Sequence, residues 1–271
     1  MRPQGGNARL AVLSQGLACI CGCLLALLMA LSLTLFREGY YLNQLENSGC
    51  LQTLYGSILE ASHSVARTAG LREDILDGLV SQEAVRVAVV RRADQIWHGA
   101  TDQPDTPYAD LVSYLQDTVT RETGEMWDQS DAEHYGVIRL VCEDMWQTNV
   151  VPPLSNLLNM LMQYRQICWI LMVVLAALLL ACLWFQIPFG TAWKDVTQAL
   201  FSIGAALVLA GLLCALLIQL SGWESWMAAT DPGYPLYFLW FRGLPPVVAA
   251  CHLALAALLW CAALVSRELG R

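Results

Sequence analysis

The sequence predicts an all-α, polytopic membrane protein with four transmembrane helices and one extracytoplasmic helical bundle. Four uncharged apolar runs are each long enough to cross about 30 Å of hydrocarbon as a helix. Charge is distributed unevenly, because residues 37–165 hold 28 of the 38 charged side chains of the 271-residue chain. In addition, no stretch alternates apolar and polar residues with the period of two that predicts a half-buried strand.

The overall composition fits this fold class. Apolar residues make up 56% of the chain and charged residues 14%, whereas soluble domains usually carry about 25% charged residues. The net charge is −8, and Lys194 is the only lysine. Because a phosphate-binding surface needs clustered lysine and arginine, we expect no nucleic-acid partner.

The four apolar runs cover residues 10–36, 167–185, 196–220 and 245–265, and none contains Asp, Glu, Lys or Arg. Backbone polar groups in hydrocarbon must be paired within helices or closed barrels, and these runs lack a strand period. The first run could instead be a cleaved signal peptide, and Ile20–Cys23 resembles a lipobox. Its apolar length exceeds the usual ~7–15 residues of a signal peptide, so we expect an uncleaved helix.

These runs predict three regions. Residues 1–36 are a cytosolic N-terminus and the first transmembrane helix, residues 37–165 an extracytoplasmic helical domain, and residues 166–271 three transmembrane helices with a short cytosolic C-terminus. Positive charges favour the cytosolic side. Four crossings place five basic residues on the same side: Arg2, Arg9, Lys194, Arg267 and Arg271. We therefore expect a multi-pass protein of the cell membrane with both termini in the cytosol.

Helical patterns fill residues 37–165. We expect the first crossing to continue as a helix to about Val65, before an interruption at Gly70. A second helix is expected from Ser81 to Trp97, because its apolar residues recur every three or four positions.

A loop over residues 99–107 then leads to a helix start at Thr106–Pro107, where proline suits the first helical turn. A separate helix is expected to start at the capping box Ser130–Glu133 and to carry Ile138, Val141 and Met145 on one face. A last helix, from about Leu154, runs into the second crossing.

Candidate sites outside the membrane are few. Cys50 and Cys142 could form a disulfide in an oxidising space, or remain free thiols. Glu60 and His63 share a helix face, and His98, Asp102 and Asp105 lie in or beside one loop. We expect a solvated face and a polar connector there, with no metal and no cofactor, because a di-iron site would need the Glu–His motif twice.

Two features lie inside the apolar runs. His252 is an ionisable residue at membrane depth, a position that often marks function, and Gln198 and Gln219 are its possible hydrogen-bonding partners. Ala18, Gly22, Ala26 and Ala30 form a stripe of small residues that would let helices approach closely. We expect this stripe to pack within the four-helix cluster, with oligomerisation as the alternative.

Three short segments carry a family resemblance: Gly39–Tyr41, Gly70–Leu71 and Ile96–Gly99. In these segments the chain resembles a group of bacterial membrane proteins of uncharacterised function. The resemblance covers mainly residues 37–100. It implies one crossing, a helical outer domain and then three crossings, and it implies no activity or site residue.

The chain contains no HExxH, CxxC, P-loop or GxSxG motif, so no catalytic chemistry is indicated. We expect a non-enzymatic integral membrane protein of the cell envelope whose outer helical domain binds a partner or ligand. Its expected partners are the lipid bilayer and either another membrane protein or a second copy. One alternative is a permease or transporter subunit, and another is a sensor-like membrane component without its own output domain.

Overall fold

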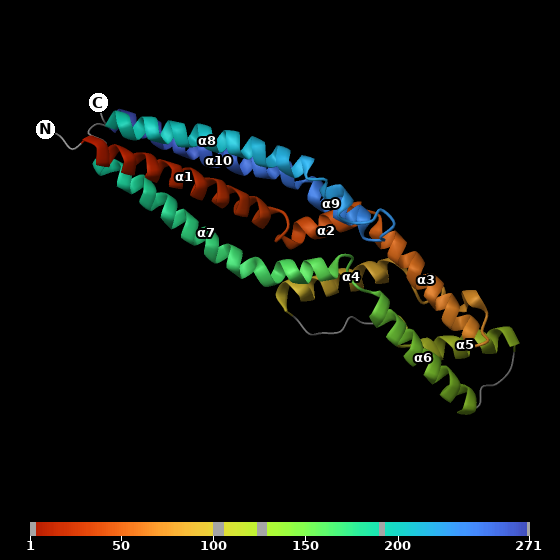
Figure 1. The fold of residues 1–271 in the computed structure, drawn as a ribbon. Helices are drawn as coiled ribbons and strands as arrows, with labels where there is room; N and C mark the ends of the chain where they lie inside the picture. The colour runs from red at the N-terminus through yellow and green to blue at the C-terminus, as the bar shows by residue number, and fades with distance from the viewer. Residues whose placement is uncertain (1–3, 100–105, 124–128, 190–192, 270–271) are drawn as a thin grey trace. The chain divides into compact units, whose positions relative to one another are not determined.

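A computed structural model describes residues 4–99, 106–123, 129–189 and 193–269, and most of these residues are helical (Figure 1). No strand occurs in these residues, which confirms the all-α prediction. The α-helices are α1 (Gln4–Leu33), α2 (Glu38–Asn47), α3 (Cys50–Thr68), α4 (Gln82–His98), α5 (Leu111–Thr123), α6 (Gln129–Asn149), α7 (Ser155–Phe189), α8 (Trp193–Leu220), α9 (Tyr234–Arg242) and α10 (Leu244–Leu269); the short 3-10 helices are η1 (Glu73–Leu76) and η2 (Trp223–Ser225).

The chain divides into two compact units. The apolar unit comprises Met1–Tyr41, Met160–Ala228 and Phe238–Arg271, and the polar unit comprises Leu42–Asn159 and Ala229–Tyr237.

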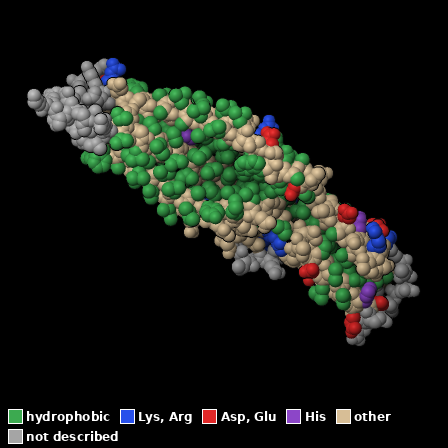
Figure 2. Space-filling model, viewed as in Figure 1, with side chains coloured by type: hydrophobic (Ala, Val, Ile, Leu, Met, Phe, Trp, Pro, Cys, Tyr) green, Lys and Arg blue, Asp and Glu red, His purple; other side chains and the backbone are tan. Residues whose placement is uncertain are grey.

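Four helical segments are long and apolar enough to cross a membrane: Val12–Leu33, Ser155–Phe185, Val196–Ser225 and Tyr234–Glu268. This confirms that the four predicted runs form helices able to span a membrane. Their outward side chains are apolar, as at Val173 (67% exposed) and Leu180 (67% exposed), and Figure 2 shows hydrophobic side chains covering the visible face of these helices. An apolar face this large on a soluble protein would be an aggregation liability, whereas hydrocarbon accommodates it.

The core of the apolar unit lies where α1, α7, α8 and α10 meet. It includes Ala18 of α1, Leu175 of α7, Leu207 of α8 and Ala256 of α10. Ala18, Ala26 and Ala30 are fully buried, and a Cβ on Gly22 would lie 3.0 Å from Leu207 Cδ2. The predicted small-residue stripe therefore packs inside the unit.

A seam of small residues on α8 sets its register with α10. The hydroxyls of Thr197 and Ser266 are hydrogen-bonded at 2.9 Å, and Gly204 lies beneath Trp260, whose indole N–H donates to the Phe201 carbonyl at 3.2 Å. One further heptad along, a Cβ on Gly211 would lie 2.5 Å from His252 Cβ. In these three pairs the residue number rises along α8 and falls along α10, so the two helices are antiparallel. They approach closely at Gly204 and Gly211.

The junction after α1 differs from the prediction. The expected continuous helix to Val65 is wrong, because α1 ends at Leu33 and Gly49 separates α2 from α3. Gly49 has φ +73°, a left-handed conformation that glycine adopts without strain. Ser48 reinforces the break, since its hydroxyl donates to the Leu45 carbonyl and accepts from the Cys50 amide.

The polar unit is a bundle of α3, α4, α5 and α6. Gly70 (φ +73°) follows the end of α3 as predicted, and Ser81 Oγ caps α4 by accepting from the Ala84 amide at 3.1 Å. Helix α5 begins at Leu111 and not at Thr106–Pro107, because the Thr106 hydroxyl instead accepts from the Tyr108 amide within a turn. Helix α7 starts at Ser155 and continues without a break into the second span, as predicted.

Candidate functional site

A solvent-open groove of about 620 Å³ lies between α3 and α6 in the polar unit. Its lining is mostly apolar and comprises Ser64, Val65, Thr68, Ala69, His134, Val137, Ile138 and Val141. We call this set of residues the α3–α6 groove. Binding sites are usually concave and mostly apolar with a few polar groups, so its composition suits recognition.

Helix α6 leaves apolar side chains unburied along this groove. Val137 is 60% exposed and Val141 47% exposed, while Ile138 is buried and forms the floor. The sequence predicts Val141 on the same face as Ile138. The buried residues instead recur as Ile138, Cys142 and Trp146, so Val141 lies beside the core and faces solvent.

A buried network of side-chain contacts links α3 and α6, the two helices that form the groove. The Tyr108 hydroxyl donates to Ser62 Oγ at 2.6 Å, and the Ser62 hydroxyl donates to the Ile58 carbonyl at 2.9 Å. The Tyr108 ring meets the Trp146 ring edge-on, with the ring centroids 6.2 Å apart. All of these side chains are fully buried. Because buried polar groups that are hydrogen-bonded specify a unique packing, these contacts hold α3 and α6 together next to the groove.

Cys142 is fully buried beside Tyr108. Burial raises the pKa of the Cys142 thiol from 9.0 to about 11, and the nearby Glu143 carboxylate raises it further in the same direction. Burial also raises the pKa of the Tyr108 phenol, more than its hydrogen bond to Ser62 lowers it. Both groups are therefore neutral at physiological pH and serve packing.

Stability of the polar unit is expected to fall between about pH 9 and pH 11. The Cys142 pKa is higher in the folded than in the unfolded chain, so the folded state retains the proton across that interval and unfolding releases it. The contribution is complete below pH 9 and is lost as the pH rises through 11. Hydrogen exchange of α6 in the full-length protein measures this loss, and Cys142→Ala should flatten the pH dependence. An equally steep dependence in the variant would contradict it.

Some charged side chains beside the groove have ion-pair partners and others have none among the described residues. Arg67 Nε contacts Glu73 Oε1 at 2.9 Å, and Arg139 Nε lies 3.7 Å from Glu143 Oε1. His63 Nε2 lies 2.6 Å from Asp77 Oδ1. The predicted Glu60–His63 face is thus a solvated surface on which His63 turns to Asp77, and Glu60 remains exposed and free of any described partner.

Cys50 and Cys142 are both free thiols in the structure. The Cys50 thiol donates to the Pro232 carbonyl at 3.3 Å, whereas Cys142 lies among the core side chains of α6. Their pairing in an oxidising space stays a prediction.

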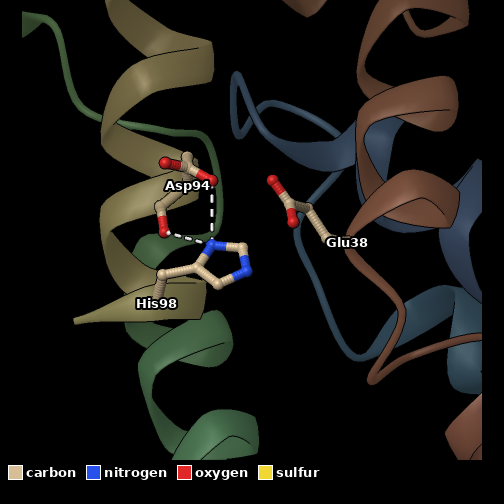
Figure 3. A group of neighbouring side chains, drawn as sticks. All are labelled: Glu38, Asp94 and His98. Atoms are coloured by element: carbon tan, nitrogen blue, oxygen red, sulfur yellow. Dashed lines mark hydrogen bonds and ion pairs between the residues drawn. The ribbon is translucent and has the colours of Figure 1, made fainter. Parts of the chain in front are cut away.

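Figure 3 shows Asp94 and His98 on one face of α4. His98 Nδ1 lies 2.8 Å from Asp94 Oδ1 and 3.2 Å from the Asp94 carbonyl oxygen. Asp102 and Asp105, the other members of the predicted loop cluster, lie outside the described residues. In the described part of the cluster, the His98 ring therefore contacts Asp94 one turn earlier on its own helix.

His252 is fully buried against Gly211 of α8. Its Nδ1–H donates to the Val248 carbonyl at 2.8 Å, and its Nε2 has no hydrogen-bond partner among the described residues. Gln198 and Gln219 are exposed and are displaced from Gly211 by about 19 Å and 12 Å along α8, at 1.5 Å per residue. The structure therefore does not bring these glutamines to the imidazole, and a transport role for His252 stays a prediction.

Sequence reasoning missed both the groove and the glycine seam. The seam had a signal, because Gly204 and Gly211 are spaced by one heptad within an uncharged run. The groove had a weaker signal in the sequence. Val137, Leu140 and Val141 repeat with helical spacing, beside the second apolar stripe of Ile138, Cys142 and Trp146. Comparison of the chain with family models, with curated proteins and with solved structures finds no match.

Proposed function

We propose that the chain is a non-enzymatic integral membrane protein of the cell envelope, and that its polar unit binds a partner protein in the α3–α6 groove. The observation that carries this proposal is the exposure of Val137 and Val141 beside a concave apolar surface. The surrounding helices bear most of the charge of the chain. A contiguous apolar patch in such surroundings is typical of an interaction site.

The membrane helices would anchor and hold this binding unit at the bilayer. Positive charges flanking the spans support an orientation with both termini in the cytosol and residues 37–165 outside. Three facts favour binding over catalysis: the groove is mostly apolar, its floor is Ile138, and the buried Cys142 thiol is protonated.

Site-specific photocrosslinking in living cells tests the groove. A benzoyl-phenylalanine at position 137 should give a discrete adduct with one partner, because its reactive ketone would lie in the groove. The matched control places the same group at Asp117, an exposed residue of α5 away from the groove. Adducts of equal yield at both positions, or none at position 137, would argue against binding in the groove.

The orientation is tested by thiol labelling of Gln52→Cys in intact cells. Gln52 is exposed on α3, whereas Cys50 is only 3% exposed and Cys142 is fully buried. A membrane-impermeant maleimide should therefore label the variant, and should label no site within residues 37–165 of the unmodified protein. Labelling that appears only after lysis would place this region in the cytosol.

A further inference from the structure

The ends of the α3–α6 groove carry unneutralised carboxylates. Glu60, Glu133 and Asp144 are exposed, and none has a hydrogen-bond or ion-pair partner in the described residues. The arginines beside the groove already lie near carboxylates: Arg67 Nε is 2.9 Å from Glu73, and Arg139 Nε is 3.7 Å from Glu143 but makes no hydrogen bond in the described residues. The free charge at the groove is therefore negative.

The helix directions fix where these carboxylates lie. Tyr108 joins Ser62 of α3 to Trp146 of α6, while the groove continues from there to Ala69 and His134. The numbering rises along α3 as it falls along α6, so the helices are antiparallel, as Figure 1 also shows.

Helical spacing then assigns each carboxylate to an end. Glu60 precedes Ser64 by one turn and Asp144 follows Val141 by one turn, so both lie at the same end of the groove. Glu133 precedes Val137 by one turn and lies at the other end. Carboxylates thus lie at both ends of the apolar centre. Along α6, positions 133 and 144 are about 16 Å apart, at 1.5 Å per residue.

We propose that the occupant of the α3–α6 groove is a basic amphipathic helix of a partner protein, an inference that rests on the proposed function. Its apolar stripe would cover Val137 and Val141. Its lysine or arginine side chains, about eleven residues apart on the helix, would meet Glu133 at one end and Glu60 with Asp144 at the other. Insertion of an amphipathic helix into an apolar groove is a common recognition mode.

Charge argues against the other occupants. A second copy of this chain would bring its own Glu60, Glu133 and Asp144 against the same carboxylates, and like charges across an interface are unfavourable. Anionic lipid headgroups would be repelled in the same way. The groove lies between helices and the described part of the polar unit has no sheet edge, so an added strand has no template there.

The test uses the full-length protein in phosphatidylcholine nanodiscs and two fluorescent helical peptides. Both carry the same leucine stripe; one has lysines at its two ends and the other has glutamates. Fluorescence anisotropy, corrected for binding to empty nanodiscs, should show the lysine peptide binding at least tenfold more tightly. Raising the salt should weaken its binding, because the end contacts are exposed ion pairs.

Variants distinguish the contribution of the carboxylates to peptide binding from that of the apolar groove surface. The double variant Glu60→Gln with Asp144→Asn should weaken the lysine peptide about tenfold and leave the glutamate peptide unchanged or bound more tightly. Asp117→Asn, which removes an exposed carboxylate of α5, should change neither. Val141→Glu should abolish binding of both peptides.

The outcomes separate failure of this inference from failure of the proposed function. Equal binding of both peptides that is lost in Val141→Glu would keep the groove as a binding site and overturn the basic partner. Binding of neither peptide, with no adduct from position 137, would overturn both. Crosslinking of position 137 to a second copy of the chain would overturn the partner class.

Discussion

Gly211→Ala is expected to destabilise the apolar unit by about 1–3 kcal/mol, the usual cost of overpacking a well-packed core, and Gly211→Leu by more. The new Cβ would lie 2.5 Å from His252 Cβ and 2.8 Å from His252 Cγ. A Cβ is fixed to the backbone and cannot rotate away, so α8 and α10 would have to separate. That separation would weaken the contacts that each helix makes along the whole seam.

Unfolding of the purified protein in mixed detergent micelles measures this effect. Gly16→Ala is the matched control, because Gly16 is also in a membrane-spanning helix and a Cβ there meets nothing within 4 Å. It should be neutral or slightly stabilising, since alanine is the better helix former. Gly204→Ala should cost less than Gly211→Ala, because it meets the movable indole of Trp260. Equal stability of the Gly211 and Gly16 variants would disprove the close approach.

Trp146→Ala is expected to destabilise the polar unit by about 3–5 kcal/mol, the usual effect of emptying a large aromatic site in a core. Trp146 is fully buried and packs edge-on against Tyr108, which in turn holds Ser62. Removing the indole would therefore loosen both walls of the α3–α6 groove. Trp146→Phe should cost much less, because it retains a ring and removes an indole N–H that has no partner among the described residues.

Hydrogen exchange of the full-length protein in nanodiscs measures this loss of stability helix by helix. Protected amides of α3 and α6 should exchange roughly a hundredfold or more faster in Trp146→Ala, since each 1.4 kcal/mol is about a factor of ten. Leu140→Ala on the same helix is the control, because Leu140 is 58% exposed, and its effect should stay within about 0.5 kcal/mol. Similar exchange in the two variants would contradict the core role of Trp146.

The sequence predicted the membrane helices well because hydrocarbon imposes a simple requirement. A span needs roughly 20 apolar residues whatever its neighbours are, so the four spans and the continuous start of α7 could be read directly. The break at Gly49 could not, since glycine is tolerated within a helix and only its left-handed backbone separates α2 from α3.

The groove shows why the candidate site was harder to predict. Helix α6 carries two apolar stripes one residue apart, and Val141 and Cys142 are both plausible core residues by periodicity. The choice is made by tertiary contacts, because Trp146 and Cys142 pack around Tyr108, which comes from before α5. A pattern within one helix does not contain that information, so the exposed valines emerge only with the fold.

Contact between residues 200 positions apart in the chain has a consequence for biosynthesis. The Tyr40 hydroxyl donates to the Trp240 carbonyl, 200 residues later in the chain, and occupies space that a side chain at position 243 would need. At about 5–20 residues per second, the ribosome needs roughly 10–40 s to make that stretch. During this delay the buried Ala26 and Ala30 of α1 lack the α10 side chains that cover them, so the core of the apolar unit can close only after the last helix is made.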